Sequence, residues 1–284
     1  MNLFSLFHSQ KQDRDPDAEY PDIWEQAEQK QQAGDLQGAL TDYDKVLKLH
    51  PDHPNVLVVR AIVKADLGDF RGAIKDLDRA LDILPLPHNA NTILIRAVIK
   101  KRSGDFIGAV EDCDALLRLN PKFVDALGLR GEIHFEADKY QEAVSDYDSA
   151  LALKADNAEH LQNRGLAKLF MNRFQDALMD FTKALSIQPE KSILFVYCAE
   201  AKRGLDDLPG AWSDYSKALQ MDPKSPMASY GLACIAAVKS QVAAAVQYLG
   251  QAIQIDPHWR ERAKHDPDFD PIRNEKLFIE LLHG

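Results

Sequence analysis

Residues 33–51, AGDLQGALTDYDKVLKLHP, return six more times in related form along the chain. The seven copies end at positions 51, 85, 121, 155, 189, 223 and 257. These positions lie 34 residues apart, except for one step of 36 where Pro85-Leu86-Pro87 adds two residues. A fixed period of this length indicates a stacked array of one supersecondary unit.

An apolar stripe begins at the same alanine position in every copy. In the first copy, Ala39 is followed four positions later by Tyr43 and after four more by Leu47. This spacing places the three side chains on one face of a helix. Proline ends that helix in six copies, and a residue suited to positive φ or to capping marks the turn before it. The turn residues are Gly34, Gly68, Gly104, Asp138, Asn172, Asp206 and Ser240.

The unit resembles the tetratricopeptide repeat (TPR), a helix–turn–helix of 34 residues with a small residue midway along its first helix, a Gly-Asp-aromatic turn, and alanine and proline in its second helix. The resemblance implies an all-α fold, a right-handed superhelical solenoid of antiparallel helix hairpins. It implies seven tandem repeats, at 20–53, 54–87, 90–123, 124–157, 158–191, 192–225 and 226–259. We expect residues 1–19 to form a disordered tail.

Residues 260–284 resemble the capping segment that closes bacterial proteins of this family. A solenoid needs such an end because the last repeat otherwise exposes an apolar face. The Asp-Pro pairs at Asp266 and Asp270 are interpreted as turns and helix N-caps, since they lack the spacing of an acidic calcium loop. The expected packing residues are Phe269, Ile272, Leu277, Phe278 and Leu281.

The composition of the 284 residues excludes several classes of protein. With 45% apolar residues, 27% charged residues and a mean hydropathy of -0.33, the chain is neither a disordered polyampholyte nor a membrane bundle. A net charge of -10 disfavours nucleic acid as a partner. The apolar run at residues 1–7 is too short for a signal peptide or a membrane span. We expect a cytoplasmic protein.

No catalytic, cofactor or metal site is predicted. The sequence contains no GxGxxG, GxxxxGK, HExxH or GxSxG motif. His50 and His53 are interpreted as loop residues, and His134 as a packing residue. The three cysteines are too far apart to indicate a disulfide framework or a zinc site, and each occupies a small apolar position of the repeat: Cys113, Cys198 and Cys234.

A polar pattern couples the two helices of the unit. Arginine precedes the small residue of the first helix in four copies, at Arg60, Arg96, Arg130 and Arg164. Aspartate precedes the large stripe residue in six copies, at Asp42, Asp76, Asp112, Asp146, Asp180 and Asp214. A partly buried guanidinium requires a carboxylate partner, although exposed surface charge is the alternative interpretation. Gln26 in the first copy and Tyr248 in the last favour a pair between each arginine and the preceding repeat.

The resemblance also implies that the first helices line a ligand groove. The inward positions, carried over to this chain together with the charged residues beside them, give the predicted peptide- or partner-binding residues Leu94, Val98, Lys101, Arg102, Leu129, Glu132, Phe135, Leu166, Phe170, Tyr197, Glu200 and Tyr230. Arg203 also occupies such a position. The alternative is that some of these side chains pack against neighbouring helices.

The co-chaperone clamp for a C-terminal carboxylate is not expected. Asn163 alone has the required residue type, while its neighbours are Gly128 and Glu132 before it, and Ile193 and Tyr197 after it. We therefore expect a non-enzymatic protein–protein interaction scaffold or adaptor that holds a peptide or a partner helix and needs no cofactor. The alternative is a structural assembly or homo-oligomerisation module that uses convex or terminal surfaces.

Overall fold

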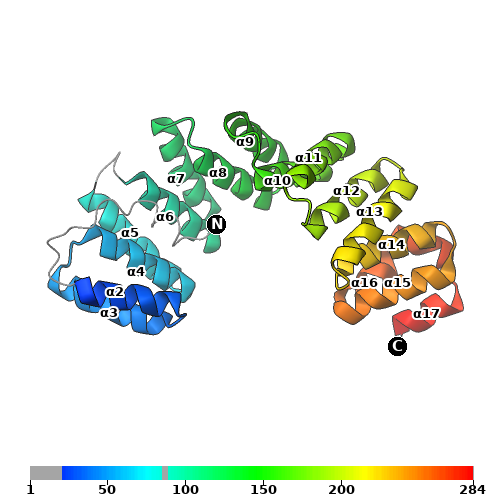
Figure 1. Ribbon diagram of the computed structural model, residues 1–284, viewed down its shortest axis with the longest axis horizontal. Coiled ribbons are helices and arrows are strands. Elements are labelled where there is room, and N and C mark those ends of the chain that lie inside the picture. The colour runs from blue at the N-terminus through cyan, green and yellow to red at the C-terminus, as the bar shows by residue number, and fades with distance from the viewer. Residues whose placement is uncertain (1–20, 85–88, 284) are drawn as a thin grey trace. The chain divides into compact units, whose positions relative to one another are not determined.

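The structure, a computed structural model, describes residues 21–84 and 89–283, and all regular elements in these ranges are helices (Figure 1). The predicted all-α fold of stacked antiparallel helix pairs is thereby confirmed. The predicted N-terminal tail and the Pro85-Leu86-Pro87 insertion lie outside the described residues. Within those residues, every helix is too short or too polar to cross a lipid bilayer.

The chain divides into two compact units, residues 1–139 and 140–284. The first unit contains α2 (Pro21–Gln32), α3 (Leu36–Leu49), α4 (Pro54–Asp66), α5 (Phe70–Ile83), α6 (Ala90–Arg102), α7 (Phe106–Leu119) and α8 (Val124–Glu136). The second contains α9 (Tyr140–Leu153), α10 (Ala158–Phe170), α11 (Phe174–Ile187), α12 (Ser192–Gly204), α13 (Leu208–Met221), α14 (Pro226–Val238) and α15 (Val242–Ile255). Its last elements are α16 (His258–His265), the 3-10 helix η2 (Pro267–Ile272) and α17 (Lys276–His283).

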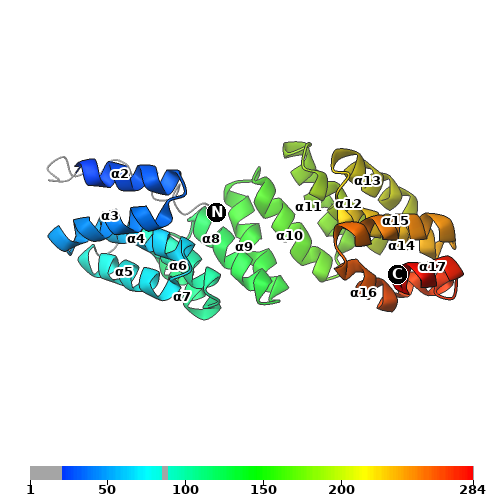
Figure 2. The ribbon, with the colours of Figure 1, turned by 90° about the horizontal axis from the view of Figure 1, so that it is seen from below.

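Consecutive helices pack as pairs within each unit (Figures 1 and 2). The pairs are α2–α3, α4–α5 and α6–α7 in the first unit, and α10–α11, α12–α13 and α14–α15 in the second. First helices of neighbouring pairs also contact each other, as α4 does α6 and as α12 does α14. Among the described residues, the second helices of neighbouring pairs approach each other less closely. The first helices therefore form the inner side of each stack.

The predicted apolar stripe forms the core between the paired helices. Its alanine and its large residue are buried in every copy, as Ala39 and Tyr43 are in α3 and Ala177 and Phe181 are in α11. Steric contact explains why the first helix carries a small residue at this position. A Cβ atom on Gly165 would lie 2.5 Å from the Phe181 ring. Glycine thus permits the close approach of α10 and α11.

The turns between paired helices follow one backbone pattern. All seven predicted turn residues have positive φ, from +54° at Ser240 to +87° at Gly68. At four turns the next residue is an aspartate that caps the second helix, as Asp69 does by accepting a hydrogen bond from the Gly72 amide at 2.9 Å. A residue with positive φ followed by an N-cap residue thus reverses the chain direction within a short turn.

The last three helical segments cover the end of the stack. Phe269, Ile272 and Phe278 are buried against α14 and α15, and Leu281 packs on the same cluster. The prediction for Leu277 was wrong, because its side chain is 51% exposed. In α17 the buried face consists of Phe278, Leu281 and Leu282, and Leu277 lies at its edge.

The turn geometry yields a prediction about two matched substitutions. A Cβ atom on Gly68 would meet no atom within 4 Å, so Gly68→Ala should cost only the backbone strain of positive φ, about 1–2 kcal/mol. Ser240→Gly should relieve the same strain and stabilise the protein by about 0.5 kcal/mol, after the larger entropy of unfolded glycine is subtracted. Denaturant titration measures both free energies of unfolding. Changes of the same sign would contradict this explanation.

Candidate interaction surface

A partly buried guanidinium connects three helices at several positions of the array. Arg60 in α4 donates from Nε and Nη2 to the two carboxylate oxygens of Asp76 in α5, at 2.8 and 2.6 Å. Its Nη1 donates to Asp44 in α3 at 2.8 Å. The same arrangement links Arg96 to Asp112 and Asp78, and Arg164 to Asp180 and Asp148. We call these contacts the arginine ladder.

The structure corrects the predicted direction of these pairs. The predicted aspartate belongs to the arginine's own repeat, and a second aspartate, two positions further along, reaches from the preceding repeat. Sequence analysis missed this second series, which comprises Asp44, Asp78, Asp114 and Asp148. The sequence does contain a signal for this second series, because the second aspartate and the arginine disappear together. Thr182 and Ser216 replace the aspartate in the repeats that precede Cys198 and Leu232, which replace the arginine.

A lysine one helical turn after the arginine adds a second cation to the buried aspartate. Lys64 reaches Asp76 at 2.7 Å, and Lys168 reaches Asp180 at 2.7 Å. In the first repeat, hydrogen bonds from Lys30 and Lys45 lower the pKa of Asp42. Burial by itself would lower the pKa of Arg60, but its bonds to Asp76 and Asp44 outweigh burial and raise that pKa. The ladder charges are therefore engaged within the protein.

Four of the predicted binding residues lie in the core. Leu94, Val98 and Leu129 are buried in the first unit. Tyr230 is buried in the second unit, where its ring contacts Trp259 and Phe269 at centroid distances of 4.5 and 5.7 Å. These four side chains pack between helices, so little of their surface is accessible to a ligand.

Charged residues of the first unit form a polar border on the inner helices. Lys101 in α6 reaches Glu132 and Glu136 in α8, each at 2.8 Å. Burial is the largest single influence on the pKa of Lys101 and would lower it, but the hydrogen bonds that Lys101 donates to these glutamates outweigh burial and raise the pKa. Phe135 is partly exposed beside them. The structure thus brings two of the predicted residues, Lys101 and Glu132, into contact.

Arg102 engages the preceding first helix. It pairs with Asp66 at 2.9 Å, and its guanidinium lies 5.7 Å from the centre of the Phe70 ring. This cation–π contact holds the charged group over an apolar surface.

An exposed phenylalanine lies on the inner side of the second unit. Phe170 at the end of α10 is 58% exposed, and its ring stacks on Tyr140 with centroids 5.1 Å apart and planes 10° apart. Leu166 and Tyr197 are half-buried and pack on the cluster around Phe181. Phe170 therefore adds an exposed apolar side chain next to the hydrophobic core of this unit.

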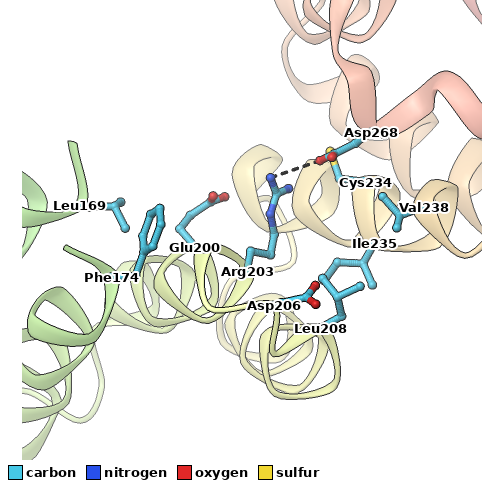
Figure 3. A pocket seen from close by; sticks show the side chains of 11 residues that line it. Leu169, Phe174, Glu200, Arg203, Asp206, Leu208, Cys234, Ile235, Val238 and Asp268 are labelled. Atoms are coloured by element: carbon cyan, nitrogen blue, oxygen red, sulfur yellow. Dashed lines mark ion pairs between the residues drawn. The ribbon is translucent and has the colours of Figure 1, made fainter. Parts of the chain in front are cut away.

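A pocket of about 350 Å³ opens beside the end of α12 in the second unit (Figure 3). Arg203 projects along it between Glu200 and Asp268, and its Nη2 atom lies 3.2 Å from Asp268. Glu200 accepts a hydrogen bond from the Tyr215 hydroxyl at 2.5 Å. Because Tyr215 is buried and faces Glu200, its pKa is raised. Sequence analysis missed Asp268, because nothing local shows that the cap folds back onto α12 and α14.

The acidic residues of the cap are already engaged. Cys234, Asp266 and Asp268 bring three possible metal ligands within 4.8 Å of one another. Asp266, however, accepts a hydrogen bond from the Tyr230 hydroxyl at 2.8 Å and caps η2 through the Asp268 amide at 3.0 Å. Asp268 pairs with Arg203, whose charge would repel a metal cation. The interpretation of the first Asp-Pro pair as an N-cap is confirmed.

The histidines and cysteines also have structural positions. His53 caps α4 by accepting a hydrogen bond from the Val56 amide. All three cysteines are buried. Burial raises the pKa of Cys198 to about 12, and it raises the pKa of Cys234 as well. These thiols are protonated at neutral pH, so they are poor nucleophiles.

The repeated helix pair and its turn match a known family. A family model described as tetratricopeptide repeat matches residues 25–87, 96–158 and 199–258, and a second model of the same description matches residues 158–191. The chain belongs to the tetratricopeptide repeat family. No curated protein sequence matches the chain.

Solved structures of TPR proteins have the same fold. A tetratricopeptide repeat protein from Parabacteroides merdae is 17% identical with a TM-score of 0.66, covering 92% of this chain and 96% of that one. Part of a TPR repeat-containing protein from Cytophaga hutchinsonii is 15% identical with a TM-score of 0.66, covering 88% and 99%. YrrB, described as a TPR protein with an unusual peptide-binding site, is 14% identical with a TM-score of 0.54, covering 66% and 95%.

The ladder geometry predicts unequal costs for two arginine substitutions in the first unit. Arg60 is 18% exposed and pairs with a buried aspartate, whereas Arg79 is 50% exposed and pairs with the exposed Asp52. Arg60→Ala should reduce the free energy of unfolding by about 3 kcal/mol, because it leaves Asp76 buried with only Lys64. Arg79→Ala should cost less than about 1 kcal/mol. Denaturant titrations giving similar losses would show that the ladder adds no more than surface charge.

The raised pKa of Cys198 predicts a loss of stability in alkaline solution. Folding shifts this pKa from an ordinary value of 9.0 to about 12. Below pH 9 the thiol is protonated in both states, and its contribution is fully present. Above pH 9 only the unfolded chain releases the proton, so stability should fall by about 1.4 kcal/mol per pH unit until about pH 12. Unfolding titrations from pH 8 to 11 should show a shallower decline for Cys198→Ala. Parallel declines would refute the assignment.

Proposed function

We propose that this TPR protein is a non-enzymatic scaffold or adaptor that binds a peptide or a helix of a partner protein along the inner side of its helix stacks. Proteins of this family are generally protein-interaction modules, and one structural neighbour is described as having a peptide-binding site. The observation that carries the proposal for this chain is the exposed Phe170 ring on the first helix α10 of the second unit, which stacks on the half-buried Tyr140 at the start of α9.

Exposed aromatic rings are effective anchors for a partner. A large apolar side chain that becomes buried contributes about 1.5–3 kcal/mol, and aromatic residues dominate the binding energy of many interfaces. The stacked arrangement holds Phe170 in one orientation before binding, which lowers the entropic cost of association. Half-buried Leu166 and Tyr197 continue the apolar surface along α10 and α12.

The first unit supports the proposal through a different chemistry. Lys101, Glu132 and Glu136 form a charged border on α6 and α8, beside the partly exposed Phe135. Charges at the edge of an interface orient a partner and select against wrong ones more than they add affinity. A ligand with spaced apolar side chains and few specific hydrogen bonds fits this surface.

Assembly through other surfaces is the second candidate function. On α17, Leu277 and Ile279 are 51% and 42% exposed at the end of the second unit. The second helices also expose single apolar side chains, including Ile107 in α7 and Met179 in α11. Such residues could join copies of the chain or other subunits without use of the inner side.

A pair of matched substitutions distinguishes these functions. Phe170→Ala and Met179→Ala each remove an exposed apolar side chain, 58% and 64% accessible, from the inner and the outer helix of one repeat. With a partner identified by affinity capture and then purified, Phe170→Ala should weaken binding about tenfold in calorimetry, while Met179→Ala should leave it unchanged. Circular dichroism confirms that both variants remain helical. The reverse ranking would favour assembly through the second helices.

A further inference from the structure

We propose that the pocket beside α12 binds a lysine or arginine side chain of the partner, and that Asp268 of the C-terminal cap forms part of its acidic wall. This inference rests on the proposed function, because it names the chemistry of the ligand at one place on the inner surface. The pocket lies entirely within the second unit, and its lining residues come from the helices α10 to α14, the turn between α12 and α13, and η2 (Figure 3).

The charges around the pocket favour a cation. Its lining contains the carboxylates of Glu200, Asp206 and Asp268 but only one cationic side chain, Arg203, among the described residues. Arg203 is already paired with Asp268 at 3.2 Å. Glu200 uses Oε1 to accept the Tyr215 hydroxyl, which leaves Oε2 for another donor. Asp206 is exposed at the rim. The lining thus contains two more carboxylates than cationic side chains.

The apolar part of the lining suits the stem of a basic side chain. Leu169, Phe174, Leu208 and Val238 surround the charged groups (Figure 3). Lysine and arginine bury their methylene chains on apolar surface while the charged head stays among polar groups. The face of an aromatic ring such as Phe174 also attracts a cation. A neutral apolar side chain would bury the lining but would leave the excess carboxylates without a partner.

An acidic ligand is disfavoured by the same contacts. An anion that contacted Arg203 would bring its negative charge close to the carboxylates of Asp268, Glu200 and Asp206. The whole chain carries a net charge of -10, which steers basic partners toward it and repels acidic ones. The carboxylates of the pocket and the net charge of the whole chain therefore both favour a basic segment.

The cap holds Asp268 in place through its neighbours. Asp266 caps η2 and accepts the Tyr230 hydroxyl, while the adjacent Phe269 is fully buried. Asp268 lies between these two anchored residues, so its carboxylate is fixed where it faces α12. The cap thereby has two roles, since it covers the apolar end of α14 and contributes a charged group to the pocket.

The test uses the full chain and a decapeptide library in which one central position is fixed in turn as each amino acid. Peptides retained by the immobilised protein should be enriched at least fivefold when the fixed residue is lysine or arginine, relative to glutamate or norleucine. Glu200→Gln and Asp268→Asn remove one charge each with little change in shape, and each should reduce this enrichment severalfold. Glu190→Gln changes an exposed residue of the turn before α12, at the end of that helix away from the pocket, so it is the matched control and should leave the enrichment unchanged.

The outcomes separate this inference from the proposed function. Retention of peptides without a basic preference, or with an acidic one, would overturn the inference while peptide binding itself stands. A basic preference that persists in Glu200→Gln and Asp268→Asn would also overturn it, because the cation would then bind elsewhere. Retention of no peptide would overturn the inference and would count against groove binding too. Raising the salt concentration should weaken the basic preference in the unsubstituted protein.

Discussion

The close approach of two helices at one small residue organises the whole repeat. In α10, Gly165 faces the Phe181 ring of α11 at a separation that excludes a Cβ atom. Between neighbouring repeats, Gly231 of α14 is likewise too close to the Tyr215 ring of α13 to carry a Cβ atom. Arg164 precedes Gly165, and Asp180 precedes Phe181, so the contact that joins the small and the large residue also brings the guanidinium to the carboxylate. Steric fit therefore positions the ion pair.

The arginine ladder then couples neighbouring repeats. A guanidinium has enough donors to bind both oxygens of one aspartate and still reach a second carboxylate, which a lysine cannot do in a fixed geometry. The coupling ends at Cys198, where Thr182 replaces the second aspartate, and the last two repeats are joined by apolar side chains. The ladder pairs the guanidinium groups of Arg60, Arg96 and Arg164 with aspartates, whereas α12, beside the pocket, carries Cys198 at this position.

Much of the fold followed from the sequence because the repeat presents the same physical problem seven times. The stripe that begins at Ala39 and the turn at Gly68 each recur at fixed intervals, so chance agreement is averaged out. The direction of the arginine pairs did not follow from helix geometry, because the rise per residue permits pairing within a repeat or between repeats. The missing information lay at the second aspartate position, where Asp148 precedes a repeat with arginine and Thr182 precedes a repeat without it. Of the predicted surface, Phe170 lies exposed, whereas Leu94 and Leu129 are core residues, since an inner helix is apolar on nearly every side.

By itself, the sequence determined the helix pairs, their turns and the positions of the stripe, because these depend on contacts between residues close together in the chain. Only the tertiary structure decided which residues cover α14, the first helix of the last pair. Tyr230 was predicted to face a ligand, but the cap folds back over it and places Asp268 next to Arg203. That contact joins residues far apart in the chain, and no periodic pattern specifies it. The pocket exists because burial of Phe269 and Ile272 fixes where the cap must lie.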